Sequence, residues 1–150
     1  MDALESLVPL GDDYASGSIA DAFDWTAAGE ALGTGEWYMV AFRSVRRADA
    51  DDVVLTFHDD LAHAEATAAP GYIHYFKGPL AANGTCLSFC IWSDRAAARA
   101  ASGRPHHAQA ATLVGDMYEH YALEFLRLRR EADGPLTFEP YDTPLVAVAS

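Results

Sequence analysis

The sequence predicts an α+β fold whose elements follow the order strand, helix, strand, strand, helix, strand. Aromatic and β-branched runs alternate with segments in which small and apolar residues recur at helical spacing. An Asn83-Gly84 pair between two strand-like runs favours a tight antiparallel turn. With 150 residues, of which 51% are hydrophobic and 21% charged, the chain is long and apolar enough to bury one compact core.

The charge balance excludes two classes of partner. Ten Lys and Arg against 22 Asp and Glu give a net charge of -12, which repels phosphate backbones and anionic membranes. We therefore expect no nucleic-acid partner. The sequence begins without a basic segment, and no apolar run approaches the ~18 residues of a membrane span. We expect a cytoplasmic protein with no membrane span.

Residues 1–34 predict an irregular N-terminal arm, because glycines and acids interrupt them and only residues 20–23 favour a short helix. The arm contains Phe23 and Trp25. Such large apolar side chains are expected to cover a surface, either of their own domain or of a partner subunit.

The run "EWYMVAFRSV", residues 36–45, predicts the first strand because it is aromatic and β-branched. A helix is predicted to follow, with acids at its start and Pro70-Gly71 at its end. His63 is expected on the solvent side of this helix. Its apolar face would contain Val53, Phe57, Leu61, Ala64 and Ala68.

Residues 72–77 and 85–92 predict two further strands, joined as a hairpin. Cys86 and Cys90 lie too far apart on one strand to form a disulfide. An alanine-rich helix capped by Ser or Asp follows and ends at Gly103, and Pro105 begins a second helical piece. Residues 121–130 predict the fourth strand, although their spacing could also continue the helix.

This order is the ferredoxin-like split βαβ plan, in which helices cover one face of an antiparallel sheet. In residues 85–92, successive side chains point to opposite faces of the sheet, and both sets include apolar residues. The sheet face that the helices leave open would therefore also need to be buried. A second copy packed face to face would supply that cover, which predicts a homodimer. We divide the chain into an N-terminal arm (1–34), an α+β barrel domain (35–132) and a C-terminal extension (133–150).

In element order, residues 36–130 resemble the dimeric α+β barrel superfamily, which includes antibiotic-biosynthesis-type monooxygenases and haem-binding or haem-modifying proteins. The run "LSFCIWSDRAAARAASGRPHHAQAA" is similar to spheroidene-monooxygenase-type haem proteins. The resemblance implies a small-molecule oxidoreductase of the monooxygenase type, haem-dependent or cofactor-independent, that acts on an apolar or aromatic substrate. Haem-degrading members of the superfamily use an asparagine in their site. The only asparagine here, Asn83, belongs to the predicted turn, so the resemblance does not extend to haem degradation.

Candidate catalytic residues come from the histidines, because the sequence contains no nucleotide-binding loop, CxxC, HExxH or nucleophile elbow. His106 and His107 follow Pro105 in the first turn of a helix, where the dipole favours neutral imidazole. His106 would face inward as acid, base or, where haem is bound, axial ligand. His58, at the edge of the first helix, is the third candidate. Polar residues that merely finish a helix end would fit the same pattern.

The aromatic side chains predict a pocket for a flat apolar ligand. An ordinary core would explain the same aromatics, so a non-enzymatic ligand-binding or assembly module of the same fold is the alternative function. The candidate substrate-binding residues are Trp92, Tyr118, Tyr72, His74, Phe89 and Arg104.

Overall fold

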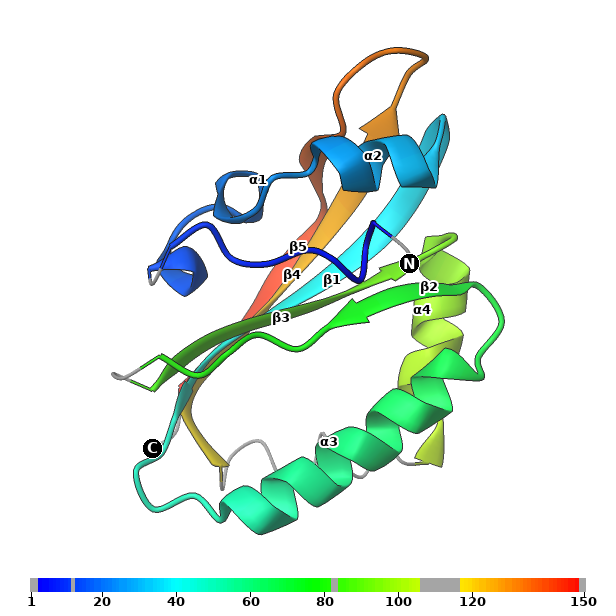
Figure 1. The fold of residues 1–150 in the computed structure, drawn as a ribbon. Helices are drawn as coiled ribbons and strands as arrows, with labels where there is room; N and C mark the ends of the chain where they lie inside the picture. Colours follow the sequence, from blue (N-terminus) through cyan, green and yellow to red (C-terminus); the bar gives the residue numbers. More distant parts are fainter. Residues whose placement is uncertain (1–2, 12, 82–83, 106–116, 149–150) are drawn as a thin grey trace.

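The computed structural model describes residues 3–11, 13–81, 84–105 and 117–148. Its centre is a five-stranded antiparallel sheet in the order β2-β3-β1-β4-β5 (Figure 1). The strands are β1 (Gly35–Arg46), β2 (Tyr72–Phe76), β3 (Thr85–Trp92), β4 (Tyr118–Arg130) and β5 (Thr137–Val148). The helical elements are η1 (Tyr14–Ser16), α1 (Ile19–Ala22), α2 (Thr26–Leu32), α3 (Asp52–Thr67) and α4 (Arg95–Ser102).

The predicted α+β class and the split βαβ order are confirmed. Two of the predicted helices, α3 and α4, lie on one face of the sheet (Figure 1). The helical piece predicted to begin at Pro105 lies largely outside the described residues. The segment whose type was open is a strand, β4, and it begins at Tyr118. β5 was not predicted: it lies in residues 133–150 and pairs with β4 at the edge of the sheet. An edge strand tolerates Pro140, because a proline there costs no interior ladder hydrogen bond.

The N-terminal arm covers the other face of the sheet, which we call the arm face. In Figure 1, α1, α2 and the segment before them lie on the side opposite α3 and α4. Phe23 is 2% exposed and packs edge-on against Phe76 and Phe89, with ring centroids 5.0 Å and 5.6 Å apart. The guanidinium of Arg43 on β1 donates to the carbonyl of Ala15 at 2.7 Å. Phe23 and Trp25 thus cover their own domain.

This packing changes the argument for a second copy of the chain. The face that we expected a partner sheet to cover already has a cover from residues of the same chain. The homodimer stays a prediction, but an uncovered arm face no longer motivates it. The division at residues 34 and 132 also stays a prediction, although the arm and the sheet contribute to one core.

The predicted apolar face of α3 is wrong. Val53 and Phe57 are 79% and 59% exposed, whereas Leu55 is 5% exposed and packs near Met117 and Tyr118. The side of α3 that faces the sheet includes Asp59 as well as Leu55. Asp59 interrupts the apolar pattern on this inward side. A prediction from hydrophobic periodicity therefore assigns the wrong side of the helix to the core.

α4 packs closely against Gly71, the residue that precedes β2. Gly71 has φ +83°, and a Cβ there would lie 2.5 Å from the Cβ of Ala97 and 2.6 Å from Oγ of Ser93. The carboxylate of Asp94 caps α4 by accepting from the N–H of Ala97 at 2.8 Å. Cys86 and Cys90 are free thiols, as predicted. Within the described ranges, no helix combines the length and apolarity that a membrane crossing requires.

Candidate functional site

An acid lies between α3 and the sheet. Oδ2 of Asp59 is 3.8 Å from Nζ of Lys77, which follows β2. Burial raises the pKa of the Asp59 carboxyl, and the positive charges of Lys77 and Arg46 oppose that rise. A carboxylate with a raised pKa is a stronger base than an exposed aspartate, so Asp59 is suited to accept a proton.

Two phenols lie near this acid, one half-buried (Tyr75) and one buried (Tyr118). Burial raises the pKa of Tyr75 on β2 and of Tyr118 at the start of β4, and the negative charge of Asp59 raises both further. The side chain of Ser88 also hydrogen-bonds with Tyr75. Both phenols therefore stay protonated at neutral pH and remain available as hydrogen-bond donors.

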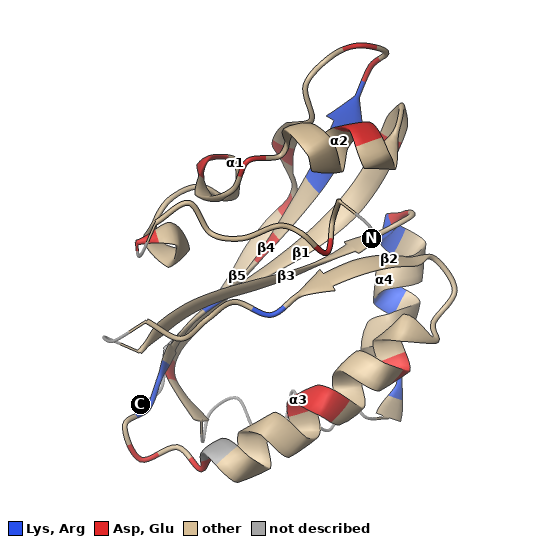
Figure 2. Ribbon diagram, in the orientation of Figure 1, with Lys and Arg blue, Asp and Glu red and all other residues tan. Residues whose placement is uncertain are grey.

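We call Asp59, Tyr75, Lys77 and Tyr118 the α3–sheet cluster. Figure 2 shows that α3 carries acidic and no basic side chains, whereas basic residues lie on the strands and α4. A base beside two neutral donors and an ammonium group can remove a proton and stabilise the oxyanion that results.

The α3–sheet cluster was only partly predicted. Tyr118 was a candidate, whereas Asp59 and Tyr75 were not. The position of Asp59 on its helix is the one signal that could have found it. Residues 55, 59 and 66 share one face of α3, and in the structure all three are buried or half-buried. His63 was expected in solvent, but it is half-buried and its ring centroid lies 4.6 Å from that of Tyr75.

The structure separates the predicted substrate-binding residues into three places. Trp92 and Tyr72 pack edge-on, with centroids 5.8 Å apart, and Nε1 of Trp92 donates to Sγ of Cys90 at 3.0 Å. Tyr118 lies near α3 against Phe42. They do not form one pocket.

Phe89 and His74 lie on the opposite face of the sheet from Trp92 and Tyr118. Phe89 is buried beneath the arm, and the His74 ring centroid is 6.3 Å from that of Phe89. These two residues belong to the packing of the arm face. The expectation that they line a pocket together with Trp92 is wrong, because side chains alternate between the two faces of a strand.

The remaining candidate residues lie in different parts of the chain. His58 is half-buried on α3, next in sequence to Asp59, and its ring packs edge-on against Phe57. Arg104 is half-buried just after α4. His106 and His107 lie outside the described residues, so their roles stay predictions.

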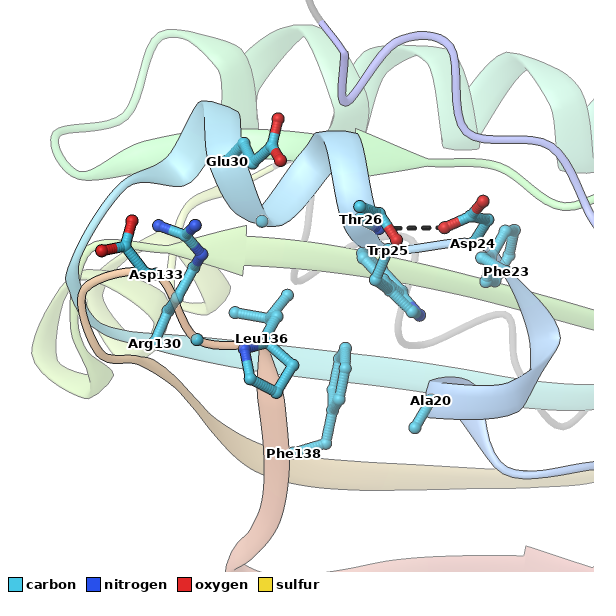
Figure 3. Close-up of a pocket in the computed structure, with 13 residues that line it drawn as sticks. Ala20, Phe23, Asp24, Trp25, Thr26, Glu30, Arg130, Asp133, Leu136 and Phe138 are labelled. Carbon is cyan, nitrogen blue, oxygen red and sulfur yellow. Dashed lines mark hydrogen bonds between the residues drawn. The ribbon is translucent and has the colours of Figure 1, made fainter.

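We consider two of the cavities that border described residues. The first, of about 500 Å³, lies between the arm helices and the connection from β4 to β5 (Figure 3). The second, of about 380 Å³, lies between the start of β2 and α4, and Arg104 is part of its wall. Neither cavity borders Asp59, Tyr75 or Tyr118.

The described residues do not fit a haem at either cavity. A haem iron needs a histidine, cysteine, methionine or tyrosine as axial ligand. None of these residue types lines either of the two cavities. A search of the described residues also finds no group of three or more His, Cys, Asp or Glu that could hold a metal ion. Haem ligation by His106 stays a prediction from the sequence.

Comparisons with known proteins place the fold. The chain matches the PB2B2.08-like family over residues 1–140, and no curated protein matches it. The structure is similar to PA3566 from Pseudomonas aeruginosa, with 12% identity, a TM-score of 0.53, and coverage of 65% of this chain and 97% of that one. It is also similar to Rv0793 from Mycobacterium tuberculosis, with 20% identity, a TM-score of 0.50, and coverage of 76% and 97%. SnoaB, described as a cofactor-independent oxygenase from Streptomyces nogalater, overlays with 15% identity, a TM-score of 0.48, and coverage of 64% and 93%.

Proposed function

This chain belongs to the PB2B2.08-like family and has the fold of the dimeric α+β barrel superfamily, and from that premise we propose that it is a small-molecule oxidoreductase of the monooxygenase type. The α3–sheet cluster is the observation that carries the proposal. Its substrate would be an apolar, electron-rich aromatic molecule, and its oxidant would be molecular oxygen.

Asp59 would act as the base. It would remove a proton from an acidic C–H or O–H of the substrate, and the raised pKa of its carboxyl favours this transfer. Tyr75 and Tyr118 would donate hydrogen bonds to the oxyanion that forms, since both stay protonated. Lys77 would balance the charge of Asp59 before the transfer.

The substrate anion would then supply the electrons. For a substrate with a reactive CH₂ group, oxygen adds to the carbanion and forms a C–O bond. The O–O bond breaks, one oxygen atom remains as a carbonyl, and the other leaves as water. The overall change is CH₂ plus O₂ to C=O plus H₂O, which balances without an external reductant.

Oxygen uptake with anthrone tests the proposal, because anthrone loses a proton from its CH₂ group to give a phenolate. We expect Asp59→Asn to lower the rate about 100-fold, the usual contribution of a general base. The exposed acid Asp49, which precedes α3, provides the control: Asp49→Asn should keep the wild-type rate. Equal rates for the Asp59→Asn variant and the wild-type protein would refute the assignment of the base.

One observation favours the alternative, a non-enzymatic ligand-binding or assembly module. Neither of the two cavities borders the α3–sheet cluster, whereas both could hold a small molecule. This alternative requires that anthrone, and other electron-rich phenols, cause no protein-dependent oxygen uptake. Catalytic uptake that depends on Asp59 would exclude it.

Two further proposals concern assembly and location. A homodimer and a cytoplasmic location are both proposals from the sequence and the superfamily resemblance. Light scattering tests the homodimer, since a monomer has a mass of 16.2 kDa. A measured mass at that value would remove the homodimer.

A further inference from the structure

The larger cavity, which we call the arm cleft, is built by the two segments outside the predicted four-stranded plan. The N-terminal arm contributes Phe23 and Trp25 (Figure 3). The start of β5 contributes Leu136, which precedes the strand, and Phe138, which lies within it. The ring centroids of Trp25 and Phe138 are 5.0 Å apart. The accessible part of this aromatic wall comes mainly from Phe138, because Phe23 and Trp25 are only 2% and 7% exposed. The arm cleft lies on the face opposite the α3–sheet cluster.

The charges around this aromatic wall are unbalanced. Three carboxylates, from Asp24, Glu30 and Asp133, border the arm cleft together with one guanidinium, from Arg130 (Figure 3). Nη1 of Arg130 donates to the carbonyl of Gly33 at 3.3 Å. The arm cleft thus carries an excess of negative charge beside an apolar surface.

The carboxylate of Asp24 is held ionised. It accepts a hydrogen bond from the N–H of Thr26 at 3.0 Å, and that bond lowers the pKa of Asp24. In Figure 3, Asp24 lies at one end of the arm cleft, whereas Glu30, Asp133 and Arg130 lie toward the other. Both ends of the arm cleft therefore present a carboxylate.

Gly29 of α2 lines the arm cleft beside the connection from β4 to β5. A Cβ on Gly29 of α2 would lie 3.4 Å from the Cβ of Leu136 and 3.6 Å from Cδ of Arg130. Because glycine has no side chain, α2 approaches the β4–β5 connection without filling the volume between them. The volume of about 500 Å³ is within the range of small-molecule sites.

We propose that the arm cleft binds an organic cation with an apolar or aromatic body, of the arylalkylammonium class. Its ring would lie against Leu136 and Phe138, which are half-buried, and its ammonium group would lie among the carboxylates. The faces of aromatic rings and ionised carboxylates both attract a cation. This site does not rest on the proposed oxygenase function, since it shares no residue with the α3–sheet cluster.

Calorimetric titration of the full chain with three probes tests the proposal. Phenethylammonium, 2-phenylethanol and phenylacetate have similar apolar bodies and differ in the charge of the head group. We expect the cation to bind about fivefold more tightly than the alcohol, and the anion to bind most weakly. Equal affinities for the cation and the alcohol, or no binding of the cation at millimolar concentration, would overturn the proposal.

Charge variants locate the binding. Glu30→Gln and Asp133→Asn should each weaken the cation about threefold and leave the alcohol unchanged. Both should keep the fold, because Glu30 is exposed and Asn tolerates the positive φ of Asp133, +59°. Arg130→Gln should strengthen the cation and weaken phenylacetate. Asp60→Asn, an exposed acid on the opposite face, is the control, and a loss of cation affinity there as large as in Glu30→Gln would show attraction by net charge alone and overturn the site.

Discussion

Tyr38 on β1 donates its hydroxyl hydrogen to Oδ2 of Asp142 on β5 at 2.7 Å, across the intervening strand β4. Nε of Arg95 on α4 donates to the same oxygen at 2.8 Å. One carboxylate therefore joins the middle of the sheet, its last strand and the second helix of the split βαβ unit. The contact spans 104 positions of the sequence.

Acid should weaken the fold through Asp142. The hydrogen bond from Arg95, followed by that from Tyr38, lowers the pKa of Asp142. A lowered folded-state pKa gives stability that is present above the ordinary Asp pKa, about 4, and is lost as pH falls through the folded value. Thermal unfolding at a series of pH values should therefore show a steeper acid loss of Tm in the wild-type protein than in Asp142→Asn. Equal slopes would contradict this role.

The arm should contribute strongly to stability through Phe23. Phe23→Ala removes a ring that is 2% exposed and leaves a cavity, so we expect a loss of about 3–5 kcal/mol in urea unfolding. Val8→Ala is the control, because Val8 is 67% exposed, and should change stability by less than about 0.5 kcal/mol. A loss below about 1 kcal/mol for Phe23→Ala would mean that the arm does not pack on the sheet in solution.

Gly71 should not accept a side chain. Gly71→Ala would force a Cβ against Ala97 and Ser93 at a positive φ, and we expect it to cost about 2 kcal/mol or more in thermal or urea unfolding. Gly17→Ala is the matched control, because a Cβ there meets nothing within 4 Å and its backbone is extended. Equal stability of the two variants would contradict the described packing of α4.

Asp59 should reduce stability at neutral pH. Its raised folded-state pKa means that the folded chain holds this proton more tightly than the unfolded chain, so stability falls as pH rises through the window from the ordinary Asp pKa to the raised value. Asp59→Asn should therefore have a higher Tm than the wild-type protein at pH 7, and the difference should shrink in acid. A lower Tm at pH 7 would show that its pairing with Lys77 outweighs the cost of burial.

The regular core of the fold follows from local pattern, and its additions do not. β1, α3, β2, β3 and α4 were predicted because periodicity and turn residues act over a few positions, whereas for β4 the pattern left a helix as the alternative. β5 was missed because Pro140 and Pro144 are read as breakers, and only its edge position makes Pro140 compatible with pairing. The arm was predicted to cover a surface. Whether that surface belongs to the same domain or to a partner subunit depends on contacts between residues far apart in the sequence, which local pattern does not reveal.

The α3–sheet cluster shows a different limit. An aspartate on a helix is usually solvated, so sequence pattern places Asp59 outside and Phe57 inside, and the structure shows that Phe57 is the exposed one. Asp59 pairs with Lys77, and its charge acts on Tyr75 and Tyr118, and all three partners come from other parts of the chain. Such a site is assembled by tertiary packing and leaves no local motif.

The cover that the arm gives the sheet has a consequence for the order of folding. Trp25 packs on Phe138, a residue of β5 that lies more than 100 positions further along the chain. Long-range contacts of this kind slow folding, because loop closure must precede the gain from burial. The packing of Trp25 on Phe138 therefore cannot form until residues 26–138 have been made, whereas Phe23 can already pack on Phe76 and Phe89 of β2 and β3.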